Sequence, residues 1–468
     1  MENEKILEET FDETLDRVLA DIIALIEEKK YRTARDTIIN ELHNGADIAE
    51  VMESIIDKAG IERAIIIFRM LPKDILAEVF AYLPIDDQVN IINGITDKEI
   101  QFIMDEMDFD DMIDVMEELP ANLVDKILEK TPKEERRLIN TFLNYPDDCA
   151  GSIMTPDYIS LRADMTVGES LLYIKKVGMD SETVYTCYVK DKGRKLIGII
   201  SLRTLVISDD NAAVGDIMHD DYVFVNVYDD QEEVSEVFKK YDFLALPVVD
   251  KEHRLVGIIT VDDIIDVIEE ETTEDFERMA GILDGSDKEY LDMSVFHHVK
   301  TRLPWLMLLM VELMITGVII TQFEEMLSKV IVLVSYLPLL MGTGGNCGNQ
   351  AATLIIRGMT VGELEPSDAF KVLWKEFRVS FIVGLVLSII NIVKILFNDR
   401  QSLIIALTVG ASMLIIVALA KIIGGLLPMG AKKIGVDPAL MANPMISSLT
   451  DMVSVLTYFF LATLLLGI

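Results

Sequence analysis

The stretch PLLMGTGGNCGNQAATLIIRG, residues 338–358, decides the fold of the second half of this chain. It is long enough to cross a bilayer as a helix, which takes roughly 20 residues. Glycines and the amides Asn346, Asn349 and Gln350 nevertheless recur along it. Small residues allow helices to pack closely, and amides in hydrocarbon need water or another helix as a partner. The stretch therefore predicts a membrane helix with one polar, closely packed face.

Similar apolar stretches lie on both sides of it. We expect five membrane-spanning helices, at about residues 303–320, 330–356, 379–397, 403–427 and 438–466. Under alternating topology the outer loops hold only Lys329 and Arg400, and the other basic residues near the spans face the same side as the N-terminal part. By the positive-inside rule, this predicts a multi-pass protein of the plasma (inner) membrane, with its N-terminus cytosolic and its C-terminus outside.

Charge divides the chain at the same place. Of the 42 Lys and Arg and the 79 Asp and Glu, residues 301–468 hold 11 and 10, which leaves 31 and 69 for the first 300 residues. An acidic soluble part thus precedes a nearly neutral membrane part. Its surface would repel a polyanion, so we expect no nucleic-acid partner and consider metal cations the natural counter-ligands. The three cysteines are far apart and predict neither a zinc ribbon nor a disulfide scaffold.

The first part of the chain shows a helical repeat. Breaks recur in steps of 12 residues, at Pro72, Pro84, Thr96, Asp108, Pro120 and Pro132. Proline is tolerated in the first turn of a helix, and Thr and Asp are good N-caps, so each break predicts the start of a two-turn helix. Such repeats bury a core only by stacking. We therefore expect an all-α helical-repeat domain over residues 1–146, whose turn carboxylates serve as caps or solvated groups.

A second repeat follows, with a different pattern. KLIGIISLRTL (195–205) matches RLVGIITVDDI (254–264), and SIMTPDYISL (152–161) matches DIMHDDYVFV (216–225). Within each unit, short β-branched runs alternate with amphipathic helices, which predicts a β-α-β-β-α order. This doubled pattern resembles a tandem pair of CBS domains over residues 147–268, with units at about 147–210 and 211–268.

CBS pairs often bind adenosine nucleotides through a Thr/Ser-x-x-Asp step after the last strand. Thr260 and Asp263 satisfy that step, whereas the first unit has Ser201 and Thr204 and lacks the acid. The resemblance therefore implies that only the second unit could hold a nucleotide such as ATP in this way. The acidic, amphipathic segment that follows predicts a long connecting helix over residues 269–300, before the membrane domain at 301–468.

Polar groups inside the predicted spans indicate where function lies, because an ionisable residue in hydrocarbon is costly. The strongest candidate is Asp451, which follows Ser447, Ser448 and Thr450 in the last span. We expect Asp451 to line an ion pathway. Asp437 lies at the cytosolic entrance, where it could bind an ion or cap a helix. We expect Glu312 and Lys394 to be the remaining intramembrane charges, with snorkelling, interhelical or functional roles.

A single carboxylate lined by amides and hydroxyls suits hydrated Mg2+, because magnesium gives up its waters reluctantly whereas calcium prefers many direct oxygen ligands. No His lies in the predicted spans and Cys347 stands alone, so zinc and copper are disfavoured. Two subunits around a two-fold axis would place two Asp451 carboxylates on one ion path.

The domain order, PLLMGTGGNCGNQAATLIIRG and DPALMANPMISSLTDMVSVLTYF (437–459) together resemble the MgtE family of magnesium channels. The resemblance covers nearly the whole chain. It implies a homodimer in the lipid bilayer with a pore on its two-fold axis, the hydrated ion at Asp451, and polar pore neighbours at Asn349, Thr353 and Asn443. It also implies that the connecting helix acts as a plug.

The resemblance further implies regulation by Mg2+ bound to acidic residues of the cytosolic part. The implied sensing residues are Asp230, Glu232, Asp242, Asp263, Asp266, Glu271, Glu274 and Asp275. The charge alone supports the same mechanism, since divalent ions that bridge carboxylates would moderate the repulsion between two strongly acidic chains. High cytosolic Mg2+ would then favour a compact, plugged state, which amounts to negative feedback.

Other functions stay open at this stage. The membrane domain is also compatible with a cation-coupled carrier or exchanger, and with a broader transporter of Mn2+ or Co2+. The CBS pair alone is compatible with a nucleotide-sensing regulator or a membrane enzyme. We find no nucleophile-base pair, P-loop or catalytic metal cluster, and therefore expect no enzymatic activity.

Overall fold

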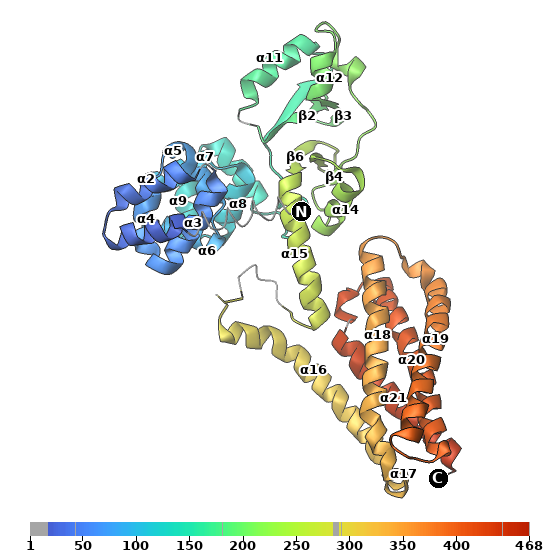
Figure 1. Ribbon diagram of the computed structural model, residues 1–468. Helices are drawn as coiled ribbons and strands as arrows, with labels where there is room; N and C mark the ends of the chain where they lie inside the picture. The colour runs from blue at the N-terminus through green and yellow to red at the C-terminus, as the bar shows by residue number, and fades with distance from the viewer. Residues whose placement is uncertain are drawn as a thin grey trace. The chain divides into compact units, whose positions relative to one another are not determined.

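The computed structural model describes residues 17–42, 44–179, 181–283, 290–291, 293–441 and 443–467, without the side chains of residues 74, 326, 441 and 443. The chain divides into two compact units, Met1–Ile268 and Glu269–Ile468. The first holds a helical stack and two small sheets, and the second holds long apolar helices (Figure 1). The predicted multidomain architecture is confirmed.

Short helices form the first part of unit 1. They are α2 (Tyr31–Glu41), α3 (Gly45–Ala59), α4 (Ile61–Phe68), α5 (Lys73–Ala81), α6 (Ile85–Gly94), α7 (Asp97–Glu106), α8 (Phe109–Glu118), α9 (Ala121–Lys130) and α10 (Lys133–Phe142). The N-caps of α5 to α10 lie at the six positions of the predicted 12-residue step. These helices have 9 or 10 residues, which is nearly three turns rather than the two expected. Each helix begins directly after its cap and therefore fills most of the 12-residue step.

The helices bury a core by stacking. Each packs against the helix two places further along the chain, as α4 does on α6 and α6 on α8. The core is aliphatic and aromatic, and Phe68 and Phe80 are almost fully buried in it. Gln88 is a buried polar residue of this stack, and its Nε2 donates to the carbonyl oxygens of Phe80 at 2.9 Å and Leu83 at 2.8 Å. That side chain satisfies orphan carbonyls at the end of α5, which lets the next helix follow closely.

The sheets of unit 1 confirm the predicted order. The first unit runs β1 (Tyr158–Arg162), α11 (Val167–Val177), β2 (Thr183–Lys190), β3 (Leu196–Ser201) and α12 (Leu202–Ile207); α13 (Val214–Ile217) leads to the second, which runs β4 (Val225–Asn226), α14 (Gln231–Tyr241), β5 (Ala245–Val249), β6 (Leu255–Thr260) and α15 (Val261–Ala280). In each sheet the central strand pairs in parallel with the first strand and antiparallel with the third.

The two repeats hold each other reciprocally. A Cβ on Gly257 of β6 would lie 2.7 Å from Sδ of Met154, and one on Gly198 of β3 would lie 2.7 Å from Sδ of Met218. Met154 opens the first repeat and packs on the second, while Met218 opens the second and packs on the first. The glycines leave room for these crossings, which explains why the GII and IM motifs occur in both repeats.

The predicted connecting helix is present as the second half of α15. This helix ends at Ala280, followed by Gly281 at φ +72°, and does not continue to the membrane helices. A Cβ on Gly281 would lie 2.1 Å from Cδ1 of Trp305, so only glycine permits this close turn. Residues 284–289 and 292, which fall within the predicted connecting helix, lie outside the described residues.

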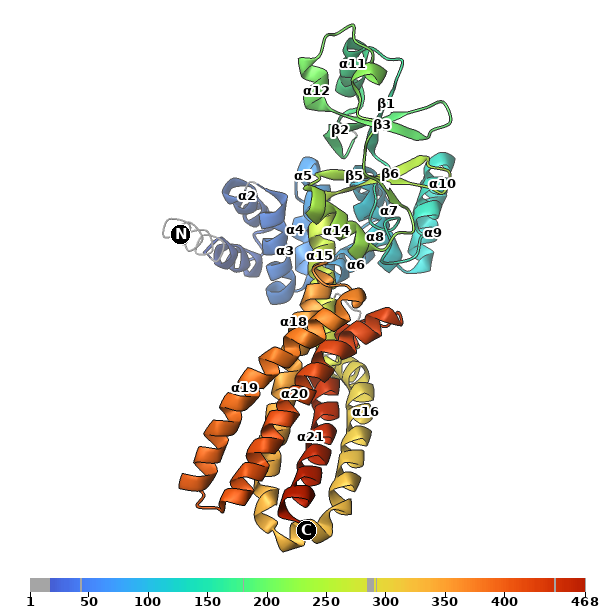
Figure 2. The ribbon, with the colours of Figure 1, turned by 90° about the vertical axis from the view of Figure 1, so that its right-hand side faces the viewer.

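Among the described residues of unit 2, five helices are long and apolar enough to span a membrane, as predicted. They are α16 (Val295–Gln322), α18 (Leu337–Thr360), α19 (Ala369–Phe397), α20 (Leu403–Lys433) and α21 (Asn443–Leu466), with the short α17 (Glu324–Lys329) after α16. The first helix begins eight residues earlier than expected and so carries His297 and His298 in its first turn. α20 packs on α18, α19 and α21, whereas α16 packs mainly on α21 (Figure 2).

Candidate ion pathway and cation sensor

The glycines of the 338–358 stretch bring α18 against two helices. A Cβ on Gly344 would lie 2.6 Å from Oγ of Ser454 on α21, and one on Gly348 would lie 2.8 Å from Cγ2 of Ile446. On the other side, a Cβ on Gly424 of α20 would lie 2.1 Å from the carbonyl oxygen of Gly348. Backbones therefore approach where side chains would normally stand, as the predicted small-residue packing requires.

A polar contact joins α18 to α21 at the same level. Nδ2 of Asn349 donates to Oγ of Ser447 across 2.9 Å, while Oδ1 of Asn349 is buried without a hydrogen-bond partner among the described residues. Asp451 is one helical turn after Ser447 and so lies on the same side of α21. The predicted neighbours Asn349 and Asp451 thus lie within about one turn of each other. The side chain of Asn443 is outside the described set.

One face of α18 is polar and uncovered in the single chain. Asn346, Gln350, Thr353 and Arg357 recur at steps of three or four residues, and all four are exposed. Such spacing places them on one stripe of the helix. A polar stripe is costly against lipid, so it must face water or a second protein surface.

Asp437 lies just before the last span, and its carboxylate accepts two hydrogen bonds. Oδ1 accepts from the backbone N of Ala439 at 2.8 Å, and Oδ2 accepts from Nη1 of Arg278 at 2.7 Å. Arg278 also donates to Glu274, one turn earlier on α15. Burial raises the pKa of the neighbouring Asp275, and the charge of Asp437 raises it further. The structure therefore brings Glu274, Asp275 and Asp437 together around one guanidinium.

Two buried charges were missed in the sequence. Lys421 of α20 and Glu376 of α19 form an ion pair with Nζ 3.5 Å from Oε2, and their side chains are only 7% and 11% exposed. The expectation that Glu312 and Lys394 complete the intramembrane charges is therefore wrong. Lys421 lies inside a predicted span and could have been found; Glu376 lies just before the predicted start of the third span.

The roles left open for Lys394 and Glu312 are also clearer. Nζ of Lys394 lies 2.8 Å from Oδ2 of Asp399, which in turn accepts from the hydroxyl of Tyr336 at 3.0 Å. Lys394 thus takes an interhelical, structural position at a helix end. Glu312 faces Ser448 of α21, where α16 and α21 pack together.

A group of carboxylates gathers in unit 1 between α8 and the start of α15. Burial, with Asp111 next, raises the pKa of Asp110 to about 7; burial and Asp110 raise that of Asp263 to about 7 and that of Glu182 to about 8. Oδ1 of Asp110 is buried and finds no hydrogen-bond partner within the described part of the chain. The residues of this acidic cluster are Asp108, Asp110, Asp111, Asp114, Glu182, Asp262, Asp263 and Asp266.

Of the predicted sensing residues, Asp263 and Asp266 belong to this acidic cluster. The helical-repeat acids and Glu182 were not assigned from the sequence, although the run DFDD at 108–111 placed carboxylates at a turn. Clustered carboxylates repel one another, and either a proton or a cation relieves that repulsion.

The other predicted sensing residues of unit 1 lie on α14. Asp230 is its N-cap and accepts from the backbone N of Glu232 at 2.9 Å. Asp242 is its C-cap, in the left-handed region at φ 54°. The two ends of this helix lie roughly 18 Å apart, at about 1.5 Å per residue. Within one chain, Asp230 and Asp242 are therefore too far apart to hold a single ion.

The candidate nucleotide residues contact each other. The hydroxyl of Thr260 donates to Oδ2 of Asp263 across 2.6 Å, and the matching pair of the first repeat, Ser201 and Thr204, lies 2.9 Å apart through its hydroxyls. Asp263 thus belongs both to the Thr-x-x-Asp step and to the acidic cluster.

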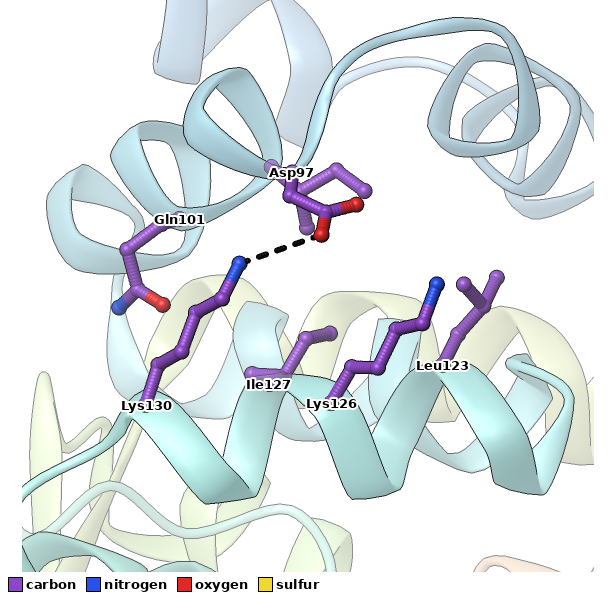
Figure 3. Close-up of a pocket in the computed structure, with 7 residues that line it drawn as sticks. Asp97, Gln101, Leu123, Lys126, Ile127 and Lys130 are labelled. Carbon is purple, nitrogen blue, oxygen red and sulfur yellow. Dashed lines mark ion pairs between the residues drawn. The ribbon is translucent and has the colours of Figure 1, made fainter.

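Two hollows elsewhere offer no ion site. Figure 3 shows the first, between α7 and α9, where Nζ of Lys130 lies 3.5 Å from Oδ2 of Asp97. Its volume of about 10 Å³ holds no more than one water molecule. The second, of about 510 Å³, lies in unit 2, and the residues that line it carry no charge. Among the described residues, no group of three or more His, Cys, Asp or Glu side chains is arranged to hold a metal ion.

Comparison with known families matches most of the chain. Residues 337–461 match the MgtE model of divalent cation transporters, residues 43–148 match the MgtE intracellular N domain, and residues 150–208 and 214–270 match the CBS domain. These ranges correspond to the membrane helices, the helical stack and the two repeats with sheets.

Individual proteins are similar over nearly the full length. The magnesium transporter MgtE of Thermus thermophilus is 36% identical over 409 residues, which cover 86% of this chain and 90% of that protein. The magnesium transporter MgtE of Bacillus subtilis is 31% identical over 464 residues, covering 96% and 98%. The crystal structure of the cytosolic domain of the Mg2+ channel MgtE in complex with ATP is 32% identical, with a TM-score of 0.49, and covers 53% of this chain and 99% of that one.

Proposed function

This chain belongs to the MgtE family of magnesium transporters, and on that premise we propose that it is a homodimeric channel that imports hydrated Mg2+ down its gradient. The observation that carries the proposal is the uncovered polar stripe of α18, which lies beside the helix that holds Asp451. A second copy around a two-fold axis would enclose that stripe and bring two Asp451 carboxylates to one water-filled path. The distribution of Lys and Arg favours a cytosolic N-terminus and a C-terminus on the outer side of the membrane.

Asp451 is the proposed ion-binding group, with Asn349, Thr353, Asn443 and Asp437 as polar neighbours of the path. One carboxylate per chain cannot replace the six waters of Mg2+, so the ion passes with much of its shell, held through water by carboxylate, amide and hydroxyl groups. Mn2+ and Co2+ have similar hydration shells. Competition among the three ions for uptake would therefore measure the selectivity of the protein.

Cytosolic Mg2+ is proposed to close this channel. Burial, and neighbouring carboxylates after it, raise the pKa values of the acidic cluster, and a divalent ion between these groups would stabilise the arrangement seen here over a more open one. The proposed sensing residues are Asp230, Glu232, Asp242, Asp263, Asp266, Glu271, Glu274 and Asp275, and we add to the proposal Asp110 and Glu182 of the acidic cluster. The second half of α15 would transmit the change to the membrane helices.

ATP is proposed as a modulator at Thr260 and Asp263, on the basis of the Thr-x-x-Asp step. Because Asp263 stands in the acidic cluster, a triphosphate there needs Mg2+ as a counter-ion. ATP binding measured by calorimetry should require Mg2+ and should weaken in Thr260→Ala. No enzymatic function is proposed, since the family consists of transporters.

Mg2+ uptake into proteoliposomes tests the central proposal. Asp451→Asn keeps the size of the side chain and removes its charge, and it should abolish uptake, while Glu324→Gln, an exposed carboxylate of α17, should leave uptake unchanged. Cobalt hexaammine, whose ligands do not exchange, should block the protein. Full uptake by Asp451→Asn would overturn the proposal, and flux that needs a sodium gradient would identify a carrier instead.

The sensor has a separate test. Mg2+ should protect the full-length protein from limited proteolysis, and neutral replacement of Asp263, Asp266 and Glu271 should remove that protection. Protection that survives these replacements would place the sensor elsewhere.

A further inference from the structure

Glu312 lies on the face of α16 that packs against α21. Its carboxylate faces Ser448 of that helix. Eleven residues later the ring of Phe323, just after α16, lies 4.9 Å from the ring of Phe459, which is eleven residues after Ser448. Both pairs have the same separation along the chain, so the two helices run parallel in one register over three turns. Figure 2 shows α16 and α21 side by side.

This register brings two carboxylates to the same depth. Ser448 and Asp451 are three residues apart and share a face of α21, so the residue that faces Ser448 also lies near Asp451. Glu312 and Asp451 therefore lie at the same level of the contact between α16 and α21. Neither Glu312 nor Asp451 has a salt-bridge partner among Lys and Arg side chains of the described residues.

Two buried hydroxyl groups near these carboxylates lack partners. Oγ1 of Thr316, one turn after Glu312 on α16, belongs to a residue that is 3% exposed. Oγ of Ser454, three residues after Asp451 and next to Gly344 of α18, belongs to a residue that is 1% exposed. Within the described part of the chain neither oxygen makes a hydrogen bond. Ser and Thr in a helix usually donate to the preceding turn when nothing better is present. Unused hydroxyls in a membrane helix pair indicate that water, or the water shell of an ion, supplies the missing partner.

We propose that Glu312 is a second acidic residue of the ion path, and that with Asp451 it sets the affinity and charge preference for a hydrated divalent cation. This inference rests on the proposed function. Two neighbouring anionic groups in a medium of low dielectric attract a doubly charged ion more strongly than a singly charged one, and its waters can reach both carboxylates and the free hydroxyls. The sequence could not pair these residues, because Glu312 lies in the first span and Asp451 in the last.

The test compares uptake by Glu312→Gln and Glu312→Asp with the unchanged protein in proteoliposomes. Glutamine keeps the size and the polarity of the side chain and loses only the charge, so the helix contact should persist. We expect Glu312→Gln to raise the Mg2+ concentration for half-maximal uptake about tenfold, equal to about 1.4 kcal/mol, with a smaller change in maximal rate. Cobalt hexaammine should block it more weakly by a similar factor, and Glu312→Asp should restore both quantities in part.

A purely structural role would lower the maximal rate and the thermal stability of both variants and leave the affinity for cobalt hexaammine unchanged; that result would overturn the inference. Unchanged half-maximal concentration and block in Glu312→Gln would overturn it too. Glu324→Gln serves as the control for loss of a membrane-unit carboxylate elsewhere. Failure of the proposed function is recognised separately, because Asp451→Asn would then transport Mg2+ as the unchanged protein does.

Discussion

Arg278 and Asp437 form an ion pair across 2.7 Å, with Nη1 of the guanidinium donating to Oδ2 of the carboxylate. Arg278 is near the end of α15, and Asp437 precedes the last membrane helix by six residues. The same guanidinium also contacts Glu274. Within unit 2, one cationic side chain therefore ties the connecting helix to the entrance of the helix that carries Asp451.

Breaking this ion pair should favour the open state. The Arg278 side chain is 38% exposed, so its loss should lower the unfolding free energy by no more than about 1 kcal/mol. Release of α15 is the larger effect, and we expect Arg278→Gln to need more internal Mg2+ for closure in patch-clamp recordings.

Reversal of the two charges provides the control for that prediction. Asp437→Arg alone should behave like Arg278→Gln or worse, and the combined Arg278→Asp and Asp437→Arg should recover part of the Mg2+ sensitivity. Additive defects in the combined variant would show that the ion pair does not couple the two segments.

The buried pair of Lys421 and Glu376 should matter more for stability. Lys421→Met leaves Glu376 without its partner in a position that is 11% exposed, which should cost about 3–5 kcal/mol. The double variant Lys421→Met with Glu376→Leu removes both charges and should recover most of the loss. Thermal unfolding in detergent measures the stability of the single and the double variant.

An exposed pair in the same unit is the comparison. Lys394 is 48% exposed in its contact with Asp399, so Lys394→Met should cost no more than about 1 kcal/mol. Equal losses for Lys421→Met and Lys394→Met would contradict the importance assigned to burial.

The acidic cluster should make stability depend on pH when divalent ions are absent. Burial first, and neighbouring carboxylates second, raise the pKa of Asp110 to about 7 and that of Glu182 to about 8. At pH 5.5 the folded protein binds protons that the unfolded chain has released, so stability falls as pH rises from about 4 to about 8. Between pH 5.5 and 8.5 we expect a loss of roughly 1–3 kcal/mol in the presence of EDTA.

Mg2+ should reverse most of that loss at pH 8.5, because a bound cation replaces the protons between the carboxylates. Asp110→Asn should flatten the profile and weaken the Mg2+ effect. Asp97→Asn changes an exposed carboxylate of the same helical stack and serves as the control. A profile that rises with pH would have the wrong sign for carboxyl groups whose pKa is raised by folding.

Two glycines of α20 give opposite predictions for one substitution. A Cβ on Gly424 would lie 2.1 Å from the backbone oxygen of Gly348, whereas one on Gly430 would meet nothing within 4 Å. Gly424→Ala should therefore push α20 from α18 and cost about 1–3 kcal/mol. Gly430→Ala should stabilise the helix by up to about 1 kcal/mol, since alanine is the better helix former. Thermal unfolding of the two variants tests this, and a stable Gly424→Ala would disprove the close approach.

Much of the fold follows from short-range signals in the sequence. The N-caps at Thr96 and Asp108 and the prolines in the same 12-residue step predict where helices of the stack begin, because capping is satisfied within a few residues of the chain. The membrane helices follow from hydrocarbon thickness, which demands about 20 apolar residues wherever the chain crosses. The repeated strand motifs predict the order of both sheets, because the alternation of β-branched runs with amphipathic helices is also a short-range signal.

The contacts that give charges their roles were decided by the tertiary structure. Asp110 and Asp263 are separated by about 150 residues, and only the packing of unit 1 reveals their mutual repulsion. The packing of unit 2 likewise decides that Lys421 pairs with Glu376 and that Glu312 lies near Asp451. A carboxylate alone in a sequence has an ordinary pKa and no assigned partner; burial and the nearest charge set both, and helix packing determines which charge is nearest.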